Sequence, residues 1–474
     1  MAVGAQIQVA FAAKASEHHR VLGIFGHRRG AFRSVGDVEY RGGERSKVDW
    51  SAPRRPDWTR PSSPVALPFT RVCEALRRMT RDETILALRE RIFPIAWSPG
   101  HISFAAGARS ARSAAERGIA VEAVVADAVL LKALQREKDA DLRKHAVRML
   151  ADWGPRYSAW VRLTSAQAAL GLVGAFIGVI SCVAFPGPAA AVMGLLCAAL
   201  FLLVIGLRFM SVWSEQPTDL PPPLPDASLP SYSVLVPLFQ ETEVAEQLLV
   251  ALLDLDYPRD RLDIKLILEA GDLATRALIA EAELPDHMEV IVVPACAPQT
   301  KPKALNYALQ FARGELLAVF DAEDLPDPDQ LRLAAETFAI SPDDCCCLQA
   351  RLRFHNDDDN WLTKQFAIEY ACHFELLLPM LASMSLPVPL GGTSNHFRTD
   401  VLRAIGAWDP HNVTEDADLG IRLARAGYVT GMIEAATLEE ANCELRNWFN
   451  QRSRWLKGWL RPVNRFVYLI IPVL

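Results

Sequence analysis

Two long apolar runs stand out in the pattern of hydrophobic and polar residues along this chain. Residues 164–185 contain no charged residue over 22 positions, and residues 189–207 contain none over 19 positions. At a rise of 1.5 Å per residue, a helix of either length can cross a hydrocarbon core of about 30 Å. We therefore predict transmembrane helices over 164–185 and 189–213, joined by Pro186-Gly187-Pro188. A buried helical hairpin in a soluble protein is the alternative.

Beyond a proline-rich linker over residues 214–230, short apolar runs alternate with stretches of helical spacing. The short runs are rich in β-branched residues, as buried strands are, and cover 232–236, 264–268, 290–293 and 316–320. Helical spacing covers 243–254 and 303–312 between them. This alternation predicts an α/β domain over 231–459, with a mostly parallel sheet flanked by helices. Ligands of such sheets bind outside the carboxyl ends of the strands.

The part of the chain before the apolar runs has two regions that differ in composition and hydrophobic pattern. Residues 1–67 are poor in large apolar side chains, and the first 60 carry 11 Lys or Arg against 6 Asp or Glu. This composition predicts a disordered basic tail that keeps the chain soluble or touches anionic lipid. Residues 68–152 have helical spacing over 72–79, 83–91 and 120–148 and one predicted strand over 102–106, so they form a small α/β or helical domain. Over 86–94 and 102–106 this domain resembles the N-terminal domain of type II secretion ATPases.

Composition and charge narrow the possible functions. A net charge of −6 gives no indication of nucleic-acid binding, whereas 51% hydrophobic residues favour membrane segments. The nine cysteines form no CxxC pair, which argues against a zinc site or a disulfide framework. The N-terminus shows no signal peptide. Arg156 and Arg162 precede the apolar pair and Arg208 follows it, so we expect a multi-pass protein of the inner membrane with its α/β domain in the cytoplasm.

Charged residues gather where the predicted strands end. They are Glu241 after the first strand, Glu269 and Asp272 after the second, Lys303 at the helix before the fourth, and Asp321, Glu323 and Asp324 after the fourth. Clustered acids repel one another unless they share a cation. Mg²⁺ or Mn²⁺, held by one or two carboxylates and substrate phosphates, suits such a cluster. A solvated acidic turn, marked by Pro326 and Pro328, is the alternative.

Two motifs follow towards the C-terminus, Thr414-Glu415-Asp416 and Gln451-Arg452-Ser453-Arg454-Trp455. Acids at a helix start can merely offset the helix dipole, by roughly 0.3–1 kcal/mol each. The second motif, with its Trp and Arg residues, also suits a helix that lies on a membrane surface. Neither motif is decisive alone.

In this order, and after two apolar runs, the motifs resemble the GT-A catalytic domain of family 2 glycosyltransferases. They are most similar to the membrane-embedded processive β-glycan synthases, such as bacterial cellulose synthase, over residues 232–459. The resemblance implies an inverting, metal-dependent enzyme that moves a sugar from a nucleotide-sugar, a UDP-sugar by preference, onto a growing β-glycan at the membrane. The expected partners are this donor, a glycan acceptor and membrane lipid.

The resemblance also implies roles for individual residues. Asp416 is the expected general base. The donor is expected to contact Glu241, Glu269, Asp272, Lys303 and Asp321, and Mg²⁺ or Mn²⁺ to contact Asp321, Glu323 and Asp324. The acceptor and the leaving diphosphate are expected to contact Gly392, Thr393, Ser394, Asn395, Gln451, Arg454 and Trp455.

The chain departs from the family pattern in three places. Glu269 stands where aspartate is usual, and the metal motif reads Asp-Ala-Glu-Asp from Asp321. Residues 460–474 begin an interfacial or transmembrane segment, but its final apolar run has nine residues, too few to span a bilayer. We therefore expect a C-terminally truncated synthase, with another subunit supplying the missing spans. The rival hypothesis is a catalytically silent membrane protein that binds a nucleotide-sugar or a synthase or secretion partner.

Overall fold

The structure is a computed structural model that describes residues 65–90, 92–94, 103–106, 110, 111, 114, 121–160, 165–214 and 220–466. The chain divides into two compact units, Met1–Ser63 and Pro64–Leu474, and every element below belongs to the second. The predicted tail up to residue 64, residues 215–219 of the linker and the end of the chain from residue 467 lie outside the described residues.

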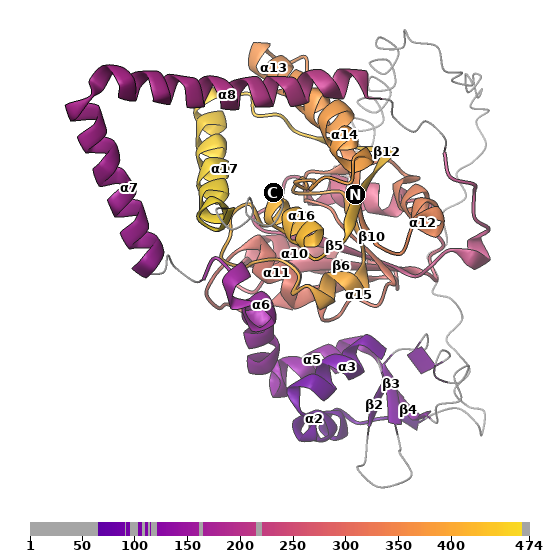
Figure 1. Cartoon of the computed structure of the whole chain (residues 1–474). Helices are drawn as coiled ribbons and strands as arrows, with labels where there is room; N and C mark the ends of the chain where they lie inside the picture. The colour runs from indigo at the N-terminus through magenta and orange to yellow at the C-terminus, as the bar shows by residue number, and fades with distance from the viewer. Residues whose placement is uncertain are drawn as a thin grey trace, which may run out of the picture. The chain divides into compact units, whose positions relative to one another are not determined.

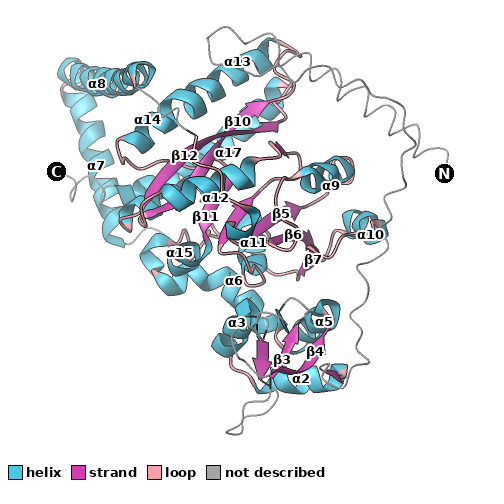
Figure 2. Cartoon of the chain, turned by 90° about the vertical axis from the view of Figure 1, so that its right-hand side faces the viewer, coloured by secondary structure: helices cyan, strands magenta, loops and turns pink. Residues whose placement is uncertain are grey.

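The largest element is an eight-stranded sheet with the order β7-β6-β5-β8-β11-β10-β12-β9 (Figure 2). Its strands are β5 (Tyr232–Leu238), β6 (Leu262–Glu269), β7 (Met288–Val293), β8 (Leu316–Val319), β9 (Leu325–Pro326), β10 (Cys345–Phe354), β11 (Asn395–Arg398) and β12 (Val429–Glu439). The four predicted strands are β5 to β8, and they pair in parallel. The second half of the sheet is mixed: β11 runs antiparallel to both β8 and β10, and β9 antiparallel to β12, whereas β10 and β12 pair in parallel.

Ten helical segments accompany this sheet in the described part of residues 231–466. They are α9 (Ala245–Asp254), α10 (Leu273–Glu281), α11 (Lys301–Leu309), α12 (Gln330–Ile340), α13 (Trp361–Tyr370), the π-helix η3 (Ala371–Leu377), α14 (Leu378–Ser383), α15 (Thr399–Ala404), α16 (Glu415–Arg425) and α17 (Leu445–Phe466). Apolar residues of the strands alternate between two buried clusters, as strand geometry requires. On β5, Leu235 belongs to one cluster, and Val234 and Val236 belong to the other.

The N-terminal elements form a small α/β unit with the sheet order β1-β4-β3-β2. They are β1 (Val65–Ala66), α2 (Phe69–Arg78), α3 (Arg81–Glu90), β2 (Ile92–Pro94), β3 (Ser103–Ala106), β4 (Val121–Val125), α5 (Asp127–Glu137), α6 (Asp139–Trp153) and the 3₁₀ turn η1 (Pro155–Tyr157). The predicted helix over 120–148 is therefore wrong at its start. Residues 121–125 pair in parallel with β1 and β3, and such partners, distant in sequence, are invisible to a local pattern.

Two apolar helices, α7 (Ser165–Ala184) and α8 (Pro186–Trp213), follow this unit. By length and composition, α8 is the one helix of the described residues that could cross a membrane, since the apolar stretch of α7, Ala168–Ala184, is shorter. A second span therefore stays a prediction. The prediction that Pro186-Gly187-Pro188 forms a loop is wrong, because these residues form the first turn of α8. Proline is tolerated there, since the first N–H groups of a helix have no intrahelical partner and no hydrogen bond is lost.

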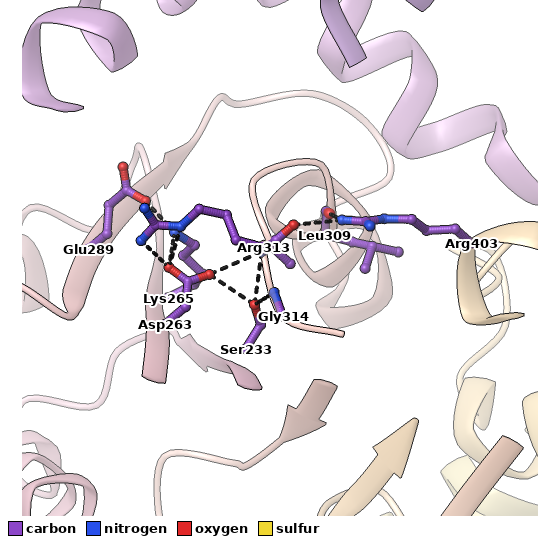
Figure 3. A network of polar contacts seen from close by, with 9 residues as sticks. Ser233, Asp263, Lys265, Glu289, Leu309, Arg313, Gly314 and Arg403 are labelled. Atoms are coloured by element: carbon purple, nitrogen blue, oxygen red, sulfur yellow. Dashed lines mark hydrogen bonds and ion pairs between the residues drawn. The ribbon is translucent and has the colours of Figure 1, made fainter. Parts of the chain in front are cut away.

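A buried ionic network fixes the amino ends of the central strands (Figure 3). The ammonium of Lys265 donates to Asp263 Oδ1 at 2.8 Å, and Arg313 Nε donates to the same oxygen at 2.9 Å. Burial alone would raise the pKa of Asp263, but these two cations hold it well below its usual range. Ser233 Oγ donates to Asp263 Oδ2 at 2.8 Å and accepts from the Gly314 N–H at 2.7 Å. The network thus anchors the chain between α11 and β8.

The turn that contains Gly406 lies close against helix α6. Gly406 has φ +81°, and a Cβ there would lie 2.9 Å from Leu150 Cα. Gly427 has a similar φ of +89° with nothing within 4 Å of its virtual Cβ. Gly427→Ala should therefore lower the free energy of unfolding by the backbone cost alone, about 1–2 kcal/mol. Gly406→Ala should cost clearly more, because backbone atoms must also move apart.

Denaturant unfolding of the two variants in detergent measures this difference. Equal losses for Gly406→Ala and Gly427→Ala would contradict the close approach of α6 to the Gly406 turn.

Candidate active site

The carboxyl ends of β5, β6 and β8 border a cavity of about 360 Å³. Three of the elements that line it supply acids: Glu241 follows β5, Glu269 ends β6, and Asp321 and Glu323 follow β8. The amino end of α11 closes another side with Thr300 and Lys301. The structure therefore brings together four of the acids predicted from the strand ends.

Mutual repulsion is visible in the acids of this cavity. Burial, together with the charge of Asp321, raises the pKa of Glu323 to about 6. Burial likewise raises the pKa of Glu241, with further contributions from Asp321 and Asp272. A cation close to these acids would lower both pKa values again, because it stabilises the ionised carboxylates.

Lys301 supplies one positive charge to this region. Its ammonium lies 2.5 Å from Asp321 Oδ1 and donates a hydrogen bond of 2.8 Å to the carbonyl oxygen of Gly392. Burial alone would lower the pKa of Lys301, but the carboxylates of Asp321, Glu415 and Asp416 raise it. Lys301 is a site residue that the sequence prediction missed in favour of Lys303. The available signal was Pro302, which marks the first turn of α11 and so places Lys301 at the helix start.

Gly392 lies between the predicted general base Asp416 and the predicted metal ligand Asp321. A Cβ at Gly392 would lie 3.3 Å from Asp416 Oδ2, 3.9 Å from Lys301 Nζ and 4.0 Å from Asp321 Oδ2. The absence of a side chain at this position lets these three charged groups converge. The predicted general base and the predicted metal ligand Asp321 therefore face the same small space.

Asp416 lies in the first turn of α16, and its Oδ1 accepts the Ala417 N–H at 2.7 Å. Burial raises its pKa, while the hydrogen bond from Ala417 and the charge of Lys301 oppose that rise. Burial and the charge of Asp416 raise the pKa of the neighbouring Glu415 to about 8. The second Oδ atom of Asp416 points towards Gly392 and remains available to an acceptor hydroxyl.

Helix α17 carries the Gln451–Trp455 motif close to the start of α16. A Cβ at Gly458 would lie 2.4 Å from Thr414 Cγ2, so the two segments are in direct contact. The guanidinium of Arg452 lies 4.6 Å from the ring centroid of Trp455 and donates to Glu369. The side chain of Arg454 is exposed, and Gln451 accepts a hydrogen bond from Asn442 at 3.1 Å.

Part of the chain is similar to known proteins. Residues 230–458 match the family model described as "Glycosyltransferase like family 2". The chain contains a family 2 glycosyltransferase domain. The "Probable glycosyltransferase YdaM" of Bacillus subtilis is 27% identical over 51% of this chain and 57% of its own length. "Glucomannan 4-beta-mannosyltransferase 1" of Oryza sativa is 25% identical over 53% and 49%, and "Beta-monoglucosyldiacylglycerol synthase" of Synechocystis 27% over 54% and 54%.

The chain thus spans about half the length of the relatives it matches. Among solved structures, it is similar to the mannosyltransferase PcManGT from Pyrobaculum calidifontis in complex with GDP-Man and Mn²⁺. That similarity has a TM-score of 0.45 and 21% identity, over 58% of this chain and 74% of the other. Staphylococcus aureus TarS in complex with UDP-GlcNAc is 14% identical with a TM-score of 0.34, over 45% and 59%.

Several residues predicted for the site of the glycosyltransferase domain lie behind the cavity instead. Asp272 Oδ2 accepts the Gln240 N–H at 2.6 Å and its Oδ1 accepts the Thr275 N–H at 3.2 Å, so its carboxylate caps α10. Although burial opposes it, these hydrogen bonds hold the pKa of Asp272 below its usual value. The ammonium of Lys303 is buried against Glu269 Oε1 at 2.8 Å. Neither residue lines the cavity.

Asp324 and the 393–395 segment have the same supporting role. Asp324 Oδ2 accepts the Asp321 N–H at 2.5 Å and the hydroxyl of Thr393. Ser394 bonds to Thr437 at 2.6 Å, and Asn395 donates to the Gly391 carbonyl at 2.7 Å. These side chains are buried and fix the Gly391-Gly392 turn.

The acid cluster includes one residue that the sequence prediction missed. Burial, with the charge of Asp324 next in size, raises the pKa of Glu439 well above its usual value. Pairing of β9 with β12 brings these residues near each other, since Leu325 is opposite Leu438. Nothing in the local sequence marks Glu439, because its neighbour Asp324 directly precedes β9, far away in the chain.

The raised pKa of Glu415 predicts an unusual dependence of stability on pH. A carboxyl whose pKa in the folded state, about 8, exceeds its ordinary value of 4.5 holds its proton more firmly when folded. The unfolded state loses that proton first, so the stability contributed by protonated Glu415 is lost as pH rises from about 5 to 8. Glu415→Gln should flatten this part of the profile.

Thermal unfolding of the detergent-solubilised chain between pH 5 and 8 measures the effect. Glu283→Gln, at an exposed position, serves as the control and should keep the wild-type slope. A Glu415→Gln profile as steep as that of the wild type would contradict the assignment.

Proposed function

We propose that the chain is an inverting, metal-dependent glycosyltransferase that moves a sugar from a nucleotide-sugar onto a growing β-glycan at the cytoplasmic membrane. The observation that carries this proposal is the convergence of Asp416, Lys301 and Asp321 on Gly392, beside the acid-lined cavity. Such an arrangement places a base, a cation and a metal-type carboxylate within reach of one anomeric centre. A merely dipole-compensating role for Asp416 would not require it to face Asp321.

The cavity at the strand ends is proposed to hold the nucleotide-sugar, preferably a UDP-sugar. Glu241 and Glu269 line its walls and can accept hydrogen bonds from ribose hydroxyls or a base edge. Lys301, at the amino end of α11, suits a diphosphate because the ammonium and the helix dipole both favour negative charge there. Asp272 and Lys303 are proposed to act on the donor indirectly, through the α10 cap and the Glu269 carboxylate.

The carboxylates fit a divalent cation shared with substrate phosphates. Among the described residues no group of three or more His, Cys, Asp or Glu side chains is placed to hold a metal ion. Asp321 and Glu323 both face the cavity, and Mg²⁺ or Mn²⁺ typically takes one or two carboxylates and completes its shell with phosphates and water. We therefore assign these two residues as ligands. The bound ion would neutralise charge on the leaving diphosphate.

The reaction proceeds by one displacement at the anomeric carbon. An acceptor hydroxyl gives its proton to Asp416 Oδ2 as its oxygen bonds to that carbon, and the bond from the carbon to the diphosphate oxygen breaks. The electron pair leaves with the nucleoside diphosphate, whose charge Lys301 and Arg454 can meet. Attack from the face opposite the leaving group inverts the configuration. Gln451 and Trp455 are proposed to contact the acceptor from α17.

Membrane attachment is part of the proposal. Helix α8 is long and apolar enough to cross a bilayer, and we propose that α7 forms a second span and that both ends of the pair are cytoplasmic. The residue ranges expected for the N-terminal domain, the spans, the linker and the catalytic domain stay proposals, except that β1 places residues 65 and 66 in the N-terminal unit and α8 begins at Pro186.

Removal of the proposed base tests the chemistry. With Mn²⁺ or Mg²⁺ and a panel of UDP- and GDP-sugars, membranes carrying Asp416→Asn should release nucleotide roughly 10²–10⁴-fold more slowly than wild type. Asp418→Asn removes a carboxylate from the same helical turn, where it pairs with Arg422 at 2.8 Å, and should stay within a few-fold of wild type.

If no donor gives release above the Asp416→Asn level, the chain is catalytically silent and the enzyme proposal fails.

Removal of the proposed metal ligand tests donor binding separately. Asp321→Ala should abolish the divalent-dependent part of nucleotide-sugar binding measured by calorimetry, because one of two carboxylate ligands is lost. Glu283→Ala, an exposed acid outside the cavity, should bind as wild type does. Binding that is unchanged in Asp321→Ala would remove Asp321 from the site.

A further inference from the structure

Helix α6 of the N-terminal unit lies beside α11 (Figure 1). Two buried amide side chains of residues 306 and 310 join the two helices. Asn306 Nδ2 donates to the Ala146 carbonyl at 3.0 Å, and Gln310 Nε2 donates to the Leu142 carbonyl at 3.1 Å. Asn306 is 0% and Gln310 2% exposed. Donors and acceptors are each spaced four residues apart, which is one helical turn on both sides.

This matched spacing fixes the register of the two helices. Apolar contacts alone, such as those of Leu142 and Met149 in the shared core, tolerate a small slide of one helix along the other. A slide here would break both hydrogen bonds between the two helices and so weaken the pairing of two buried amides. The contact therefore sets where α11 lies along its axis, and with it the position of Lys301 at its amino end.

The residues that follow α6 also contact the loop that precedes α16, the helix with the proposed general base. Asp409, which is fully buried, accepts from Ser158 Oγ at 3.2 Å and from the Ala159 N–H. Asn306 also donates to the Trp408 carbonyl at 2.8 Å and accepts the Trp408 N–H at 3.2 Å. One amide side chain thus ties α11, α6 and the loop before α16 together.

A third contact reaches α16 itself. The guanidinium of Arg425, in the last turn of α16, lies 4.9 Å from the ring centroid of Tyr157 in η1. Residues 139–159, which we name the α6–η1 bracket, therefore touch the helix that begins with Lys301, the loop of residues 406–412, and the helix that carries Asp416.

We propose that the α6–η1 bracket positions Lys301 relative to Asp416, so that the N-terminal unit sets the donor affinity and turnover of the glycosyltransferase domain. This rests on the proposed function for its kinetic consequences. The bracket residues are positioning residues, since none of them lines the cavity. The surface they form is an interaction surface between the small N-terminal unit and the catalytic domain of the same chain.

A substitution inside the N-terminal unit tests this proposal. Ala146 is fully buried on the face of α6 that meets α11, and Ala146→Leu would push the two helices apart. We expect it to raise the KM for the donor or lower kcat by roughly 3- to 30-fold, in the range of measured couplings between sites. Gln310→Ala, which removes one register bond, should act in the same direction.

Two controls separate positioning from general destabilisation. Ala146→Ser changes the side-chain volume little, so its kcat and donor KM should match those of wild type. Lys144→Ala lies on the exposed face of the same helix and should have no kinetic effect. The assay uses the full chain in membranes, with UDP-glucose, UDP-N-acetylglucosamine and GDP-mannose as donor probes and Mn²⁺ present.

Hydrogen–deuterium exchange of the full chain in detergent gives a readout that needs no turnover. Relative to Ala146→Ser, the Ala146→Leu variant should exchange faster at residues 301–305 and 414–420, the starts of α11 and α16. Faster exchange confined to α6, with unchanged donor KM and kcat, would overturn the bracket. If wild type turns over no donor, the proposed function fails, whereas the exchange data still decide the bracket.

Discussion

The crowding of carboxylates around one ammonium is the constraint on which the rest of the site depends. Asp321, Glu415 and Asp416 all raise the pKa of Lys301, and their own crowding with Glu323 in a partly buried space disfavours full ionisation. A protein keeps such repulsion only where surrounding structure enforces it. A bound divalent cation would lower this repulsion, in keeping with the proposed binding of a nucleotide-sugar through its diphosphate.

The crowded carboxylates are held in place by buried side chains that do not line the cavity. Asp272 accepts two backbone N–H groups, and Asp324 Oδ2 accepts the Asp321 N–H and the Thr393 hydroxyl. Ser394 and Asn395 make buried hydrogen bonds beside the turn that contains Gly392. The charged groups stand at strand ends, at helix starts and in the loops between them, and buried hydrogen bonds beside them help to fix where they lie. The α6–η1 bracket adds a further support from outside the catalytic domain, at the two helices whose amino ends carry Lys301 and Asp416.

Sequence patterns predicted the elements whose signals are local. The apolar runs that became β5 to β8, the helix start at Glu415, and the acids after the strand ends could all be identified in the chain order. The strand over 121–125 and the antiparallel strand β11 were missed, because each depends on partners far away in sequence. The start of α8 was predicted three residues too late, because a proline-rich run suits either a loop or a first helical turn.

The sequence by itself determined the α/β class, the long apolar helices and which acids stand at strand ends, since these follow from hydrophobic period and chain order. Only the tertiary structure decided which of those side chains meet. Lys301 rather than Lys303 faces the cavity, and Glu439 joins Asp324 across paired strands. The reason is geometric. A helix turns successive side chains by about 100°, and strand pairing joins distant segments, so facing partners depend on long-range packing that no local pattern contains.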